Sequence, residues 1–232
     1  MNIEKNALIL FFSLTAIIVF LGCTKKDSNA TNNLDAEIEG VGIPVIYETD
    51  MTLDVDDVGA LAVLHALQSE RKVTILGVSY NEVHPLAPDA IDAINTYYGR
   101  GKIPIGIYRQ DLFEPDPSDY FTSERDFDVD NMAHDSFDNI VADAVAVYKH
   151  LLISQADNSV VIISVGFLNN LHDLLKDPEG MELVKAKVKL LAIMGGLHND
   201  GFNLVRHNLV DQSQYVLENW PGTLVTTHVG GS

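Results

Sequence analysis

Cysteine and positive charge are scarce in this chain of 232 residues. Its one cysteine is Cys23, so no disulfide can form within the chain. Lysine and arginine number 15 against 33 aspartates and glutamates, which gives a formal net charge of −18. Because nucleic acids and anionic membrane surfaces attract basic proteins, this balance argues against both as partners. It suits an exported protein or one that binds cations.

An uncharged apolar run, residues 7–21, precedes the lone cysteine. The run has the length of a signal peptide and is short for a membrane span. Gly22 and Cys23 follow it, and this arrangement resembles a bacterial lipoprotein signal, in which the cysteine becomes the lipidated N-terminus after cleavage. We therefore expect a signal peptide over 1–22, lipidation of Cys23, and a protein anchored to a membrane outside the cytoplasm. The alternative is an uncleaved anchor helix.

The remaining chain divides into a tether and one domain. Residues 24–42 are polar without a hydrophobic period, so we expect a flexible tether over 23–42. From residue 43 to residue 232 the sequence shows no internal repeat and no sign of a second domain. The overall composition, 47% hydrophobic and 21% charged, is that of a globular protein with a sizeable core.

Apolar segments and segments of helical period alternate along this domain. The predicted strands are 43–50, 72–81, 103–109, 159–166, 189–196 and 222–229, and the predicted helices are 57–70, 87–99, 137–154, 170–176, 180–188 and 209–220. Asp56 or Asp57 is placed to cap the first helix, and residues 110–133 are predicted to form a long loop. Six strands, several apolar throughout, predict an α/β fold with a mostly parallel open sheet and helices on both faces.

Four aspartates lie within eight residues directly after the first predicted strand: Asp50, Asp54, Asp56 and Asp57. Carboxylates this close repel one another unless a cation lies among them. In folds of this class ligands bind at the carboxyl ends of the strands. The cluster therefore predicts a cation site.

Three other interpretations of the cluster are weaker. Helix capping accounts for one or two of the aspartates, not four. An EF-hand beginning at Asp54 fails because Val58 and His65 occupy ligand positions. A phosphatase of the haloacid dehalogenase type, with Asp54 as nucleophile and Asp56 as acid, needs the first aspartate at the strand end, where Asp50 stands.

Five short motifs occur in one order along residues 43–229. They are Glu48-Thr49-Asp50 followed by Asp56-Asp57, GVSYN ending at Asn81, SVGFLNNL at 164–171, IMGG at 193–196, and GFN at 201–203 with the helix after it. Together they resemble the nucleoside hydrolase family of the inosine–uridine preferring type, whose first motif is D-T-D…D-D. Glu48 stands where the family has its first aspartate, and the loop before Asp56 is two residues longer.

The resemblance implies hydrolysis of the N-glycosidic bond of a ribonucleoside, a small-molecule substrate, with bound Ca²⁺. By position it implies Asp50 as general base and calcium ligand, Asp57 as a second ligand, the Asn169 carbonyl as a third, and Asp56, Asn81, Asn203 and Met194 as substrate contacts. Asp54 has no counterpart in the motif. The base preference and a homo-oligomeric state stay open.

Two departures from the family pattern affect the expected activity. Gly201 stands where the family has a glutamate before Phe-Asn. Family chains also continue past the sixth strand and there supply a histidine and another aspartate that binds calcium, so we expect the C-terminal part of the fold to be missing here. The alternative function is a catalytically inactive lipoprotein of the same fold that binds nucleosides or sugars.

Overall fold

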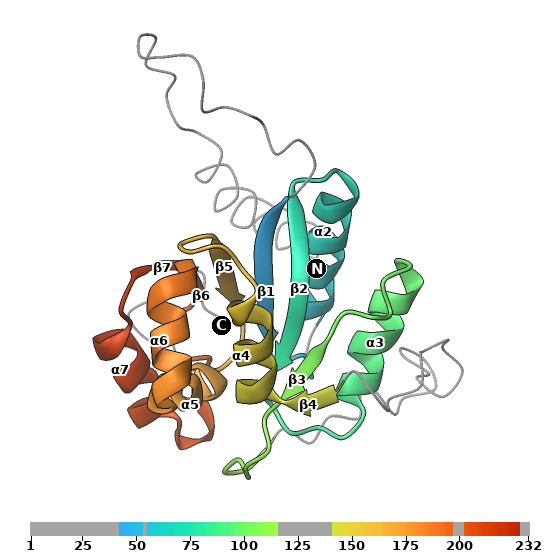
Figure 1. Ribbon diagram of the computed structural model, residues 1–232. Helices are drawn as coiled ribbons and strands as arrows, with labels where there is room; N and C mark the ends of the chain where they lie inside the picture. Colours follow the sequence, from blue (N-terminus) through green and yellow to red (C-terminus); the bar gives the residue numbers. More distant parts are fainter. Residues whose placement is uncertain (1–41, 53–54, 116–140, 197–201, 228–232) are drawn as a thin grey trace, which may run out of the picture. The chain divides into compact units, whose positions relative to one another are not determined.

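The computed structural model describes residues 42–52, 55–115, 141–196 and 202–227 (Figure 1). Within these ranges one sheet contains seven strands in the order β4-β3-β2-β1-β5-β6-β7, and every neighbouring pair is parallel. The strands are β1 Ile43–Thr49, β2 Val73–Tyr80, β3 Ile105–Ile107, β4 Val141–Asp143, β5 Val160–Ser164, β6 Val188–Met194 and β7 Thr223–Thr227. The predicted α/β class with a parallel open sheet is confirmed.

Helices cover both faces of this sheet (Figure 1). They are α2 Asp56–Ser69, α3 Ala87–Tyr97, α4 Ala144–Ile153, α5 Asn169–Lys176, α6 Pro178–Lys187, the short 3₁₀ helix η3 Arg206–Asn208, and α7 Val210–Asn219. The chain moves from β1 outward to β2 and β3 through α2 and α3. It then returns through α4 to β5 on the other side of β1 and continues outward to β6 and β7. Because such crossovers are right-handed, α2 and α3 lie on one face and α4 to α7 on the other.

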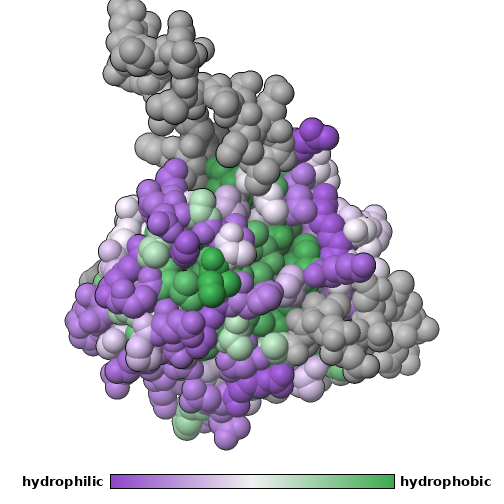
Figure 2. All heavy atoms as spheres, viewed as in Figure 1, coloured by the Kyte–Doolittle hydropathy of each residue, from purple (hydrophilic) through white to green (hydrophobic). Residues whose placement is uncertain are grey.

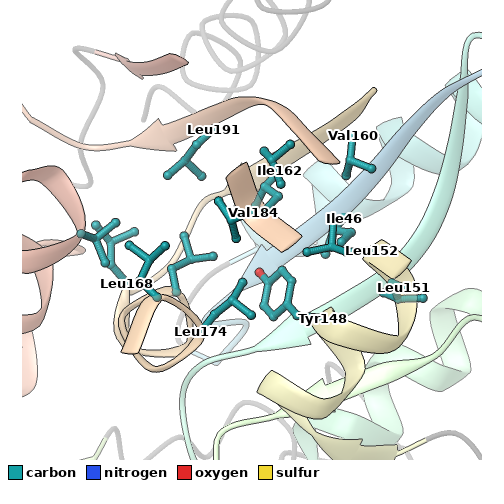
Figure 3. Packing of buried hydrophobic residues seen from close by; sticks show 14 of the residues in the cluster. Ile46, Tyr148, Leu151, Leu152, Val160, Ile162, Leu168, Leu174, Val184 and Leu191 are labelled. Atoms are coloured by element: carbon teal, nitrogen blue, oxygen red, sulfur yellow. The ribbon is translucent and has the colours of Figure 1, made fainter. Parts of the chain in front are cut away.

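One hydrophobic core lies between the sheet and helices α4 to α7 (Figure 3). Ile46 of β1, Ile162 of β5 and Leu191 of β6 point toward these helices, and Tyr148 of α4 and Leu174 of α5 pack against them. Each such side chain contributes about 1.5–3 kcal/mol through burial. The next residue along β1, Tyr47, instead contacts α2 on the other face. Burial on both faces explains why β1 is apolar nearly throughout.

The predicted helix over 137–154 is wrong at its start. Residues 141–143 form the edge strand β4, which pairs with β3, and the helix begins only at Ala144. Asp143 occupies the N-cap position, where its carboxylate accepts a hydrogen bond from the Ala146 amide at 3.0 Å. A strand of three residues is too short to show a period of its own. For this reason only six strands were predicted, whereas the sheet has seven.

The topology places a switch point at the carboxyl ends of β1 and β5. The connections leaving these two neighbouring strands run in opposite directions along the sheet, which is the switch point where open parallel sheets bind ligands. Figure 2 shows polar side chains over most of one face of the molecule, with apolar residues gathered near the centre of the view. Among the described helices none is long and apolar enough to cross a membrane, and residues 7–21 lie outside the described ranges.

Candidate functional site

The aspartates at the end of β1 are held by the elements on either side of them. Asp50 directly follows the strand and is 8% exposed, and Asp57, in the first turn of α2, is 5% exposed. The Thr49 hydroxyl donates to the Asp57 carboxylate, and the Tyr47 hydroxyl donates to the Asp57 backbone carbonyl at 3.0 Å. Burial raises the pKa of the Tyr47 hydroxyl, and the charges of Asp57, Asp56 and Asp50 raise it further, so all three carboxylates lie around this strand end.

The predicted capping role of Asp56 or Asp57 is wrong. The N-cap position of α2 is Val55, and no side chain caps the helix there. Both aspartates lie inside the first turn, where the partial positive charge of the helix terminus favours carboxylates. Asp54 lies outside the described ranges, so its role stays open.

Gly166, two residues after β5, brings three strand ends into contact. A β-carbon built on it would lie 2.5 Å from the Asp50 amide nitrogen, 2.6 Å from Asn81 Oδ1 and 2.8 Å from Asp50 Oδ1. Real β-carbons do not approach other heavy atoms so closely. The lack of a side chain at Gly166 therefore allows Asp50 and Asn81 to meet the backbone of the β5 loop.

Three asparagines fix the backbone around this point. Asn81 Nδ2 donates to the Phe167 carbonyl at 2.7 Å, and Asn169 Nδ2 donates to the Asn81 carbonyl at 2.9 Å. Asn170 Nδ2 donates to both Ser79 Oγ and the Tyr80 carbonyl at 3.0 Å. These bonds join the end of β2 to the start of α5, so the predicted residues Asn81 and Asn169 lie beside Asp50.

Asn203 and Met194 lie at the end of β6. The Asn203 side chain is buried, and its Nδ2 donates to the Val165 carbonyl at 2.7 Å and to the Met194 carbonyl at 3.1 Å. Asn203 therefore ties the ends of β5 and β6 together. It does not cap the helix that follows, because Val205 and Leu209 hold the cap positions of η3 and α7.

Several buried oxygens at this site have no hydrogen-bond partner among the described residues: Asp56 Oδ1, Asn81 Oδ1 and Asn169 Oδ1. Together with the carboxylates of Asp50 and Asp57 they form a set of acceptors of the kind that Ca²⁺ prefers. In the described ranges no group of three His, Cys, Asp or Glu side chains is placed to hold a metal. The oxygens thus fit a hard cation, with two carboxylates and amide oxygens as the donors.

Glu48 lies on the other face of β1 and is 0% exposed. Burial raises the pKa of its carboxyl group to about 8, against the opposing effect of Ser164, Asn81, Asn170 and Tyr148 nearby. None of these neighbours makes a hydrogen bond of regular geometry with either carboxyl oxygen. Glu48 is therefore a neutral acid at neutral pH, which explains how a glutamate can replace the first aspartate of the motif inside a core.

Glu82 and His207 form a buried pair that the sequence did not predict. Glu82 follows Asn81 after β2, and its Oε2 lies 3.0 Å from Nε2 of His207, with both side chains almost fully buried. The signal for Glu82 was a polar residue at a strand's carboxyl end. His207 had no signal, because the pairing spans the sequence from β2 to the segment before α7.

A pocket of about 300 Å³ lies beside Glu82. It opens between the segment that follows β2 and the segment that follows β3. Its lining includes Tyr80, Glu82, His84, Tyr108 and Arg109. The remaining predicted site residue, the lipidation site Cys23, lies outside the described ranges.

No protein-family model and no curated protein matches the chain. Solved structures do match it. A plant nucleoside hydrolase has a TM-score of 0.57 at 16% identity, covering 79% of this chain and 59% of that one. The type III effector protein XopQ, solved with adenosine diphosphate ribose, has a TM-score of 0.58 at 16% identity, covering 80% of this chain and 56% of that one.

A third match is the effector protein XOO4466, with a TM-score of 0.58 at 14% identity and the same coverage as XopQ. This chain thus spans less than two thirds of the length of each of these three structures. At these identities the likeness concerns the fold, and it confirms the expected resemblance to nucleoside hydrolases at that level. The chain has an α/β fold of the nucleoside hydrolase type, with Asp50, Asp57, Asn81 and Asn169 gathered at its switch point.

Proposed function

We propose that this chain hydrolyses the N-glycosidic bond of ribonucleosides, releasing ribose and the free base. The observation that supports this best is the convergence of Asp50 and Asn81 on Gly166, with Asp57 hydrogen-bonded to Thr49 at the same strand end, in a fold shared with a nucleoside hydrolase. The site is rich in carboxylates and buried acceptors, which suits a reaction whose sugar carbon becomes positively charged as the base leaves.

In this proposal Asp50 is the general base. It takes a proton from the attacking water, whose oxygen bonds to the sugar C1′ while the bond from C1′ to the base nitrogen breaks. Asp50, Asp57 and Asn169 would hold Ca²⁺, which when bound lowers the pKa of a water molecule and binds sugar hydroxyls. Asn169 could serve through its side-chain oxygen, which has no partner in the described structure, as well as through its carbonyl.

Asp56, Asn81, Asn203 and Met194 would hold the sugar. Asn81 Oδ1 and Asp56 Oδ1 have no hydrogen-bond partner among the described residues and can accept from sugar hydroxyls. Both contacts of Asn203 Nδ2 are to backbone carbonyls, so Asn203 would meet a sugar through its Oδ1. Met194, at the end of β6 and partly exposed, would provide an apolar contact.

A second candidate is a non-catalytic protein that binds nucleosides or sugars in the same crevice. The observation that favours it is that no group of three side chains able to hold a metal lies together among the described residues. Such a site would bind a diol and a cation weakly without activating water.

Ribose release from a panel of nucleosides, with and without a chelator, distinguishes the two candidates. We expect ribose release that the chelator abolishes and that Asp50→Asn lowers by at least about 100-fold, since a general base contributes about 10²–10⁴-fold. Asp157→Asn is the matched control, because Asp157 is exposed and pairs only with Lys187 among the described contacts. Nucleoside binding without ribose release would instead support the binding protein.

We also propose that the chain is exported and anchored through a lipid on Cys23. This rests on the apolar run at 7–21 and the Gly22-Cys23 pair after it. Cys23→Ser should abolish incorporation of labelled fatty acid and leave the precursor uncleaved. Normal processing of the Cys23→Ser variant would contradict the proposal.

A further inference from the structure

The pocket beside Glu82 has the shape and lining that a planar heterocycle requires. Its volume of about 300 Å³ is at the lower end of the range for small-molecule sites, roughly 300–1,000 Å³. The rings of Tyr80 and Tyr108 and the prolines at 85 and 88 provide flat apolar surfaces. His84, Arg109 and Glu82 provide polar groups for the edge of a ring.

The pocket adjoins the proposed hydrolytic site. The Tyr80 hydroxyl hydrogen-bonds with Thr52 Oγ1 at 2.9 Å, two residues after Asp50. Burial raises the pKa of Tyr80, and the charges of both Glu82 and Asp50 raise it further, so both carboxylates lie near its hydroxyl group. Burial and Asp173 raise the pKa of Tyr108, whereas the nearby Asn169 lowers it.

Glu82 is fixed at the inner end of this pocket. It is 1% exposed, and its Oε1 accepts a hydrogen bond from the Val83 amide at 2.8 Å. Its Oε2 lies 3.0 Å from His207 Nε2. The other ring nitrogen, His207 Nδ1, lies 2.9 Å from the Phe113 carbonyl, to which it must donate because a carbonyl only accepts. In the neutral ring Nε2 therefore carries a lone pair, and this nitrogen faces Oε2 of Glu82.

We propose that Glu82 is the acid that protonates the departing base in this pocket, with His207 as the positioning residue that faces its Oε2. The inference rests on the proposed function. As the bond from C1′ to the base nitrogen breaks, its electron pair stays on the nitrogen, which takes the proton from Glu82. Asp50 gains a proton from the attacking water, and solvent later returns one to the pair of Glu82 and His207.

The surroundings of Glu82 act on its pKa in both directions. Burial raises the pKa of Glu82, and the amide of Val83 and the charges of His207, Arg206 and His84 oppose this. Tyr80 from β2 and Tyr108 and Arg109 after β3 are the other titratable groups around the pocket. Arg206 is itself held over the Phe202 ring, 4.4 Å from its centre.

The backbone holds the His207 ring rigidly. His207 has φ 54° and Asn208 has φ 58°, a left-handed conformation that residues other than glycine adopt at an energetic cost. The Phe167 ring meets the imidazole edge-on at 4.8 Å between ring centres. Strained backbone of this kind persists where the surrounding structure requires it, and here it directs Nε2 at Glu82.

The test uses Glu82→Gln in the full chain with two substrates. The glutamine side chain can still accept from the Val83 amide and donate to His207, so the variant should fold, with a melting temperature close to that of wild type. On a nucleoside we expect kcat to fall by about 10²–10⁴-fold, the usual contribution of a general acid. On p-nitrophenyl riboside, whose phenolate leaves without a proton, we expect little change. Glu70→Gln, an exposed glutamate paired with Lys72, is the matched control and should leave both rates unchanged.

His207→Gln should lower kcat on the nucleoside, shift the alkaline limb of its pH profile, and leave p-nitrophenyl riboside unaffected. If wild type cleaves both substrates and Glu82→Gln impairs both equally or neither, the inference is overturned while the proposed function stands. If wild type cleaves neither, the proposed function fails and this inference fails with it. If Glu82→Gln does not fold, Glu82→Asp, which keeps an acid, must show the same selective loss on the nucleoside, or the inference is overturned.

Discussion

Glu48 and Asp57 lie on opposite faces of the sheet and have opposite surroundings. The Asp57 carboxylate accepts a hydrogen bond from Thr49 and lies in the first turn of α2, at the positive end of the helix. Glu48 is enclosed with Tyr148 and Ser164, where burial favours the neutral form. One strand thus separates a charged site from an acid that belongs to the core.

Glu48 predicts a pH dependence of stability. Its pKa rises from 4.5 to about 8 on folding, so the folded state keeps a proton that the unfolded state releases. The stabilisation is present below pH 4.5 and is lost as the pH rises through 8, to a total of roughly 5 kcal/mol at most. Glu48→Gln removes this dependence, so its free energy of unfolding should exceed that of wild type at pH 9 more than at pH 5.

Urea denaturation at pH 5, 7 and 9 measures this difference. Glu70→Gln serves as the control for removing a charge at an exposed position, and it should follow the wild-type pH dependence. If the free energy of unfolding changes with pH equally in wild type and in Glu48→Gln, Glu48 is not neutral in the folded state.

The sequence identified site residues that stand in local motifs and not those that depend on distant pairing. Asp50, Asp57 and Asn81 follow predicted strands or open a helix, and parallel strands bring their carboxyl ends to one edge. The opposite orientation of Glu48, by contrast, depends on which face α4 covers. The pairing of Glu82 with His207 depends on how the loop before α7 folds back, which no local pattern encodes.

At the scale of elements, the loop after β5 determines how closely β1 and β2 approach α5. Gly166 contacts both Asp50 and Asn81, and the Val165 amide donates to the Glu48 carbonyl at 2.9 Å. The strands that pack on two faces were predicted from their apolar runs. Strand β4 was missed because it is short and because Asp143, a helix cap, marks a boundary within a continuous helical pattern.

Gly166→Ala should therefore destabilise the fold and disturb the site. The added methyl group would overlap the Asp50 amide and Asn81 Oδ1, and overpacking of this kind costs about 1–3 kcal/mol. Gly59→Ala is the matched control, because nothing lies within 4 Å of its β-carbon and alanine favours a helix by about 0.5–1 kcal/mol. Thermal denaturation should show a lower melting temperature for Gly166→Ala and a higher one for Gly59→Ala. A Gly166→Ala variant as stable as wild type would contradict the close approach.

At the scale of the whole molecule, the formal charge of −18 and the acceptors at the switch point act in the same direction. The net charge raises the local concentration of cations, and the site provides oxygens of a kind that hold them. The fold class could be predicted from alternating strands and helices because each parallel strand needs a crossover helix. The affinity of the predicted cation site could not be predicted, since it depends on distances that only folding sets.

The measurement that tests the central claim most directly is the melting temperature in Ca²⁺. An ion that binds only the folded state adds about 2.7 kcal/mol at one hundred times its dissociation constant. We predict that several millimolar Ca²⁺ raises the melting temperature, that Mg²⁺ does so less because it requires stricter octahedral geometry, and that Asp50→Asn and Asp57→Asn lose most of the gain. Asp157→Asn should keep it. An unchanged melting temperature in Ca²⁺, or equal gains for Asp50→Asn, Asp57→Asn and wild type, would contradict a cation site at the end of β1.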